Sequence, residues 1–137
     1  MPKKYREVRS ALDRAGWKVL RQRGSHEIWG KDDDRARIVV AGKNSDTVPA
    51  GTPLEHQAGE WLGASAMSEY VVIFERAEDG GWGAYLPDLP GVVALGTTRD
   101  EVSERIREAV DAYAQEMEAV GQPLPDPVAA AGTIQAA

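Results

Sequence analysis

Residues 17–31 read WKVLRQRGSHEIWGK, and this stretch decides the fold of the first half of the chain. Two extended arms flank a Gly-Ser turn, an arrangement typical of a tight β-hairpin that places Arg23 opposite His26 on one face. Because residues two apart on a strand share a face, Arg21 is expected on that face too. A neutral imidazole accepts a proton near pH 7, and a guanidinium group binds anions such as phosphate. The hairpin therefore indicates chemistry on RNA.

The segments around the hairpin predict a helix, three antiparallel strands and a second helix. Residues 4–15 repeat apolar side chains at spacings of three and four, which is typical of a one-faced helix. The hairpin arms give two strands, with Leu20 expected opposite Trp29, and residues 35–41 predict the third strand. Thr52 has the side chain of a helix N-cap and is followed by proline, so a second helix is expected to begin there.

The second half of the chain predicts a three-stranded meander followed by a long helix. The strands are expected at residues 70–75, 82–86 and 92–95. The prolines and glycine of residues 87–91 predict a rigid turn before the last strand. Thr98 can cap a helix whose apolar stripe continues to Gly121. Beyond it, the proline-rich residues 123–127 must be extended, and at most a short strand is expected around 133–134.

The charge of the chain is divided unevenly between its halves. Lys and Arg outnumber Asp and Glu by 12 to 9 in residues 1–66, whereas residues 67–137 hold 4 against 13, within a net charge of −6. This division favours two small modules of opposite sign. A single domain is also compatible with 137 residues, and blocks of charge can be no more than solvated surface.

Several classes of protein and site are excluded or disfavoured by composition. The chain has no cysteine, so disulfides and thiolate metal sites are excluded. No apolar run approaches the roughly 20 residues that span a bilayer, and no signal-peptide core follows the N-terminus, so a cytoplasmic protein without membrane contact is expected. His26 and His56 are the only histidines, and the Asp32-Asp33-Asp34 run is typical of a solvated turn. We therefore expect no metal and no cofactor.

RNA cleavage without a metal needs a base for the 2′-hydroxyl proton and cations beside the phosphate. His26 is the candidate base, and Arg21, Arg23 and Lys43 are the candidate phosphate-binding residues. The structural alternative is that His26 is a surface or half-buried strand histidine without a catalytic role.

The first half resembles a known toxin family. The resemblance rests on Ala15-Gly16-Trp17, the run RQRGSHEIW at 21–29, VVAGK at 39–43 and VPAGT at 48–52. They resemble the HicA toxins, also described as YcfA-like, which are small ribonucleases acting on mRNA. The resemblance implies a fold like a double-stranded-RNA-binding domain, in the order αβββα. It also implies that the Gly-Ser-His motif carries the catalytic histidine on His26, with Gly24 and Ser25 beside it in the RNA-binding site.

The second half resembles the antitoxins that accompany those toxins. This resemblance rests on residues 70–75, DGGW at 79–82, YLPDLPG at 85–91, GTT at 96–98 and the proline-rich residues 123–127. They resemble the HicB antitoxins, which implies a partial RNase H-like βββα(β) fold and neutralisation of the toxin by covering it. Many members carry a DNA-binding domain, but no such pattern follows Val128, so autonomous DNA binding is not expected.

Together the two resemblances predict an α+β fused toxin-antitoxin chain. The expected organisation is a HicA-like domain at 1–63 with a shortened end, a linker at 64–68 and a HicB-like domain at 69–137. The expected function is a metal-independent RNA endonuclease held inactive by the acidic module, through contact within the chain or exchange between two chains of a homo-oligomer. The alternatives are a non-catalytic antitoxin or RNA-binding regulator with a relic toxin half, and a protein-interaction scaffold that does not contact RNA.

Overall fold

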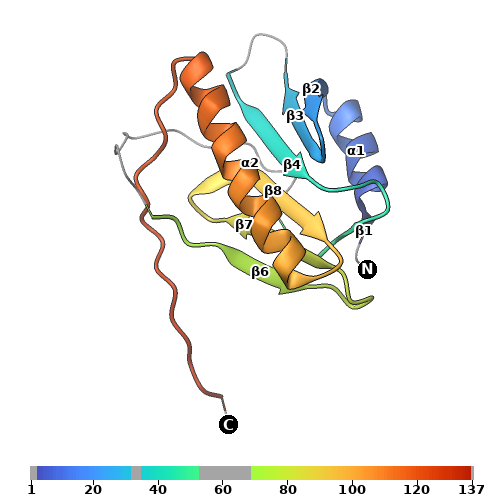
Figure 1. Ribbon diagram of the computed structural model, residues 1–137, viewed down its shortest axis with the longest axis vertical. Helices are drawn as coiled ribbons and strands as arrows, with labels where there is room; N and C mark the ends of the chain where they lie inside the picture. The colour runs from blue at the N-terminus through green and yellow to red at the C-terminus, as the bar shows by residue number, and fades with distance from the viewer. Residues whose placement is uncertain (1–2, 32–34, 53–68, 137) are drawn as a thin grey trace.

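The computed structural model describes residues 3–31, 35–52 and 69–136 (Figure 1). The helix expected to begin at Thr52, the Asp-rich turn and the expected linker fall on residues outside these ranges. The first half contains β1 (Lys3–Lys4), α1 (Tyr5–Arg14), β2 (Lys18–Arg23), β3 (His26–Gly30), β4 (Arg37–Ala41) and β5 (Thr47–Val48). The second half contains β6 (Ile73–Arg76), β7 (Trp82–Leu86), β8 (Leu89–Gly96) and α2 (Arg99–Ala119). The α+β class predicted from the sequence is confirmed.

Strands from both halves of the chain form one continuous sheet. Its order is β2-β3-β4-β8-β7-β6, and a small separate pair joins β1 to β5. The halves meet at the centre, where β4 and β8 run parallel with Val39 paired to Val92 and Ala41 paired to Ala94. The other neighbours in the sheet are antiparallel. The β4–β8 contact therefore makes the two halves parts of one sheet.

The two helices cover opposite faces of this sheet, since each packs in a different core cluster. In Figure 1, α2 crosses in front of the sheet and α1 lies to the right of β2 and β3. Alternation along β4 produces the two faces: Val39 packs in the core cluster that contains α2 residues, and Val40 packs in the cluster that contains α1 residues. Both are fully buried. Burial of such a side chain contributes about 1.5–3 kcal/mol, so each helix is held mainly by its apolar stripe.

The ends of the helices follow the sequence signals. The Thr98 hydroxyl accepts a hydrogen bond from the Glu101 amide at 3.1 Å, and the Glu101 carboxylate accepts one from the Thr97 amide at 2.9 Å. The first contact satisfies an amide of the first helical turn that has no partner within the helix, and the second fixes the residue just before the cap. Gly121 lies just beyond α2 with φ of +74°, the left-handed conformation that favours glycine. None of the described helices is long and apolar enough to cross a membrane.

Several details of the strands differ from the sequence predictions. β6 begins at Ile73 instead of residue 70, and the short strands β1 and β5 were not predicted. Residues 89–91 lie in β8 instead of a turn, and only Pro87 and Asp88 reverse the chain. Position 91 of this strand requires glycine, because a β-carbon there would collide with the Arg37 carbonyl of β4. A bulge in β2 makes Val19, not Leu20, the partner of Trp29. Within residues 120–136 no strand forms, so the short strand considered at 133–134 is not present.

Candidate functional site

The hairpin turn holds His26 in one orientation. Gly24 has φ of +58°, which a tight two-residue turn requires, and Arg23 pairs with His26 as the sequence predicted. The His26 Nδ1 atom lies 3.2 Å from the Arg23 carbonyl oxygen. A carbonyl can only accept, so Nδ1 carries the hydrogen in this contact, and a neutral ring keeps its lone pair on Nε2. The proton-accepting atom is therefore directed away from the turn.

Helix α2 occupies the space in front of that atom. Glu108 Oε2 lies 3.4 Å from His26 Nε2, and the histidine side chain is 14% exposed. Nε2 is buried and has no hydrogen-bond partner among the residues that the structure describes, so the contact with Glu108 is one of proximity. A substrate hydroxyl would need the position that this carboxylate takes.

A second carboxylate of α2 contacts two arginines on the same face of the sheet. Glu116 Oε2 lies 2.6 Å from Arg21 Nη1, and Glu116 Oε1 lies 3.4 Å from Arg37 Nε. The Glu116 residue is 8% exposed. A charge this buried is tolerated because two guanidinium groups compensate it. Arg21 is thus where the sequence predicted, on the face of His26.

Arg37, Glu108 and Glu116 were missed by the sequence analysis as site residues. Arg37 shares its face of β4 with Val39 and Ala41, so alternation along the strand was a signal for its direction. The two glutamates carry no such signal, because their partners lie far away in the sequence and meet them only through the docking of α2 on the sheet.

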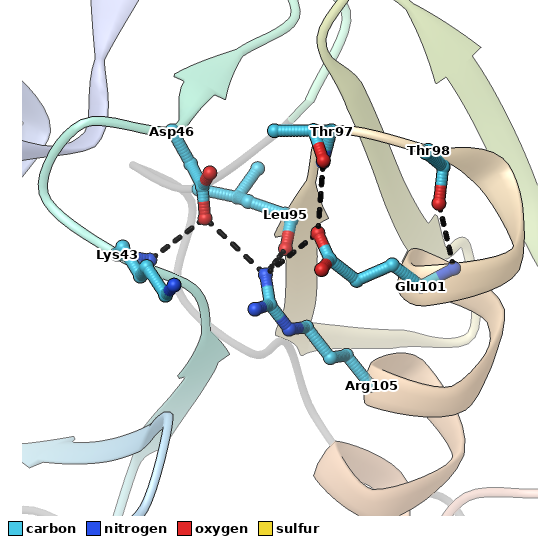
Figure 2. Close-up of polar contacts among 7 residues, drawn as sticks. All are labelled: Lys43, Asp46, Leu95, Thr97, Thr98, Glu101 and Arg105. Carbon is cyan, nitrogen blue, oxygen red and sulfur yellow. Dashed lines mark hydrogen bonds and ion pairs between the residues drawn. The ribbon is translucent and has the colours of Figure 1, made fainter.

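An ion pair also connects α2 to the loop that carries Lys43 (Figure 2). In this pair the loop supplies the acidic residue and α2 supplies the basic one. Asp46 Oδ2 accepts a hydrogen bond from the Lys43 amide at 2.8 Å and lies 3.3 Å from Arg105 Nη1. Arg105 also donates to the Leu95 carbonyl and lies 3.5 Å from Glu101. Asp46 is 7% exposed, so its charge depends on Arg105 and on the Lys43 amide.

On the opposite face, a buried carboxylate organises a second group of polar side chains. Glu27 is 4% exposed and accepts a hydrogen bond from the Tyr5 hydroxyl at 2.6 Å. Arg9 lies 3.1 Å from Glu27, and the Trp29 indole donates to the Tyr5 oxygen at 3.1 Å. Burial and the neighbouring Glu27 raise the pKa of the Tyr5 phenol, so it remains protonated and donates to Glu27.

Five of the six predicted site residues fall into two groups, and Arg23 belongs to neither. His26 and Arg21 lie under α2, whereas Gly24, Ser25 and Lys43 line a hollow of about 310 Å³ on the face of α1. Arg23 is exposed on the edge strand β2. No group of three or more potential metal ligands occurs in the described parts of the chain.

Comparison with known proteins identifies both halves. The HicA toxin of bacterial toxin-antitoxin systems matches residues 5–53, and the HicB-like antitoxin of such systems matches residues 70–137. A UPF0150 protein of Synechocystis sp. is 38% identical over 56 residues, covering 41% of this chain and 71% of that protein. A UPF0150 protein of Archaeoglobus fulgidus is 33% identical over 45 residues, covering 33% of this chain and 65% of that protein. No solved structure gives a significant match.

The two matches follow one another along the chain without overlap, in the order that the sequence motifs predicted. The chain therefore belongs to the bacterial toxin-antitoxin families, as a HicA-like toxin region fused to a HicB-like antitoxin region.

Proposed function

We propose that this protein is an RNA endonuclease module held inactive by its own antitoxin module. The toxin module is residues 1–63, the antitoxin module is residues 69–137, and residues 64–68 link them. One observation carries the proposal: the Glu108 carboxylate lies 3.4 Å from His26 Nε2, the atom that would accept the substrate proton. Glu116 supports it by pairing with Arg21, which would otherwise face a phosphate.

In the active form, the chemistry depends on His26. Its Nε2 takes the proton of a ribose 2′-hydroxyl, the oxygen attacks the adjacent phosphorus, and the 5′-oxygen leaves and is protonated by solvent. Arg21 and Arg23 stabilise the charge that develops on the phosphate oxygens. In the closed form, α2 blocks the base by position and neutralises the arginine beside it.

The second candidate is a non-catalytic antitoxin or RNA-binding regulator with a relic toxin half. The continuous sheet favours it, because uncovering His26 completely would separate α2 from a core that also contains β4 and β8 residues. A protein closed in this way would keep His26 permanently covered.

An RNA cleavage assay in EDTA separates the two candidates. The intact chain is compared with Glu108→Ala/Glu116→Gln, which removes the carboxylate before His26 and the charge beside Arg21 while keeping the shape of residue 116. We expect cleavage to rise at least about 10-fold in this variant, because one positioned base contributes about 100-fold or more. Adding His26→Ala should return cleavage to the background.

Circular dichroism verifies that each variant is folded. A folded Glu108→Ala/Glu116→Gln protein that leaves RNA intact supports the relic toxin half. Cleavage that persists after His26→Ala assigns the base to another residue.

We also propose that the protein self-associates. Both outer strands of the sheet, β2 and β6, have an unpaired edge in the described structure, and Leu20 on β2 is 47% exposed. Light scattering after size exclusion should give at least a dimer, whereas a monomer at micromolar concentration contradicts this expectation.

A further inference from the structure

We infer that the intact chain binds single-stranded RNA in a groove on the α1 face, while α2 covers His26 on the other face. The choice of RNA rests on the proposed function. The α1-side groove consists of two adjoining hollows of about 390 and 310 Å³ that share Arg9 and Asn44 in their linings. It extends from Lys18, beside the helix, to the Gly24-Ser25 turn of the hairpin.

The groove has a surplus of positive charge. Its cationic lining residues are Arg6, Arg9, Lys18 and Lys43, against the acidic Asp13 and Glu27. Glu27 is already compensated by Arg9 and by the Tyr5 hydroxyl. Arg6, Lys18 and Lys43 are exposed, and their side chains form no ion pair with any residue in the described ranges. These three cations are available to phosphate groups.

The floor of the groove is rigid. Arg9 is fixed by the Glu27 carboxylate at 3.1 Å, by the Asn44 side chain at 2.9 Å and by the ring of Trp29. A cation held by three partners loses little side-chain freedom when a ligand binds. Ser10, Gln22 and Asn44 add hydrogen-bonding groups for bases and ribose hydroxyls along the same surface.

The position of the groove relates it to the candidate catalytic residue. Its hairpin end is formed by Gly24 and Ser25, and His26 follows directly in the chain. RNA lying in the groove would thus reach the turn next to His26. Helix α2 packs on the opposite face of the sheet, so its docking leaves the groove open. The groove accordingly holds RNA without cleavage in the closed protein.

Fluorescence polarisation with a labelled single-stranded RNA tests this inference on the full chain. The groove variant Arg6→Glu/Lys18→Glu is compared with Arg76→Glu/Arg107→Glu, a control with the same change of charge at exposed positions of β6 and α2. We expect the intact chain to bind at about 50 mM salt, where phosphate contacts are strong. The groove variant should bind at least about 10-fold more weakly, and the control should stay within about 2-fold.

Three results would overturn the inference: no binding by the folded intact chain at low salt, an equal loss in the control, or tighter binding of duplex DNA than of the RNA. The salt dependence gives a second readout. Losing two phosphate contacts should make the slope of log affinity against log salt less negative by about 1.4. Binding is independent of cleavage. If Glu108→Ala/Glu116→Gln cuts RNA but the intact chain does not bind it, only the groove inference is wrong. If the intact chain binds RNA but the folded variant does not cut it, only the catalytic proposal is wrong.

Discussion

The two faces of the toxin half treat their cations differently. On the α2 face, Arg21 and Arg37 lie beside Glu116, and His26 lies beside Glu108. On the α1 face, Arg6 and Lys18 line an open groove without an acidic partner among the described residues. The acidic module thus neutralises one face of the basic half and leaves the other available. Opposite net charges of two modules therefore say little about which cations are paired.

The comparison depends first on the sheet that both faces share. Ile106→Ala on α2 and Leu12→Ala on α1 each remove a buried side chain, with exposures of 4% and 2%. We expect each to lower the free energy of unfolding by about 3 kcal/mol, from lost burial and the remaining cavity. Urea denaturation followed by tryptophan fluorescence and circular dichroism should give one coincident transition for both. Two separate transitions would show that the faces belong to independently folding units.

Removing the shared acid of the α2 face should have the next largest effect. Glu116→Gln keeps the shape of the side chain but leaves Arg21 and Arg37 without its charge, so we expect a loss of about 2 kcal/mol in the free energy of unfolding. This figure allows for the 42% exposure of the Arg21 side chain, which solvent screens. Glu118→Gln is the matched control on the exposed side of α2. Equal losses in the two variants would argue against a special role for Glu116.

The ion pair between Asp46 and Arg105 extends the comparison, because its cation comes from the acidic module and its acid from the basic half. A double-mutant cycle with Asp46→Asn and Arg105→Gln should give a coupling energy of about 1 kcal/mol, as the side chains are only 6% and 14% exposed. Chemical denaturation of the four proteins measures it. Additive losses would mean that the two residues act independently, despite the 3.3 Å between them.

The smallest effect is expected at Asp79, which connects the β6–β7 turn to Lys4 and Thr47 of the first half. Hydrogen bonds from the Thr47 hydroxyl and the Gly81 amide, with Lys4 nearby, lower the pKa of Asp79 from 3.8 to about 2. A carboxyl with a lowered pKa in the folded state stabilises the fold above its unfolded pKa, and this contribution is lost as the pH falls. Melting temperatures should therefore decrease less between about pH 4 and pH 2 in Asp79→Asn than in the parent protein. Parallel curves for the two proteins would contradict this assignment.

The sequence was sufficient wherever neighbouring residues determine the structure. The hairpin with Arg23 opposite His26 follows from the Gly-Ser turn, and α2 begins at its Thr98 cap as expected. The bulge at Leu20 and the inclusion of Gly91 in β8 were not predicted. Glycine is needed at position 91 because the backbone of β8 passes close to the Arg37 carbonyl, which belongs to a strand more than fifty positions away.

By itself, the sequence determined the two family regions, their order and the identity of the candidate base, since these reside in short motifs and local periodicity. Only the tertiary structure decided that β4 and β8 join the regions into one sheet and that the α1-side groove stays open. It also decided that Glu108 lies beside His26 and Glu116 beside Arg21. The physical reason is that charge pairing acts over a few ångströms. Which glutamate meets which cation depends on the docking of α2, a contact between segments far apart in the chain.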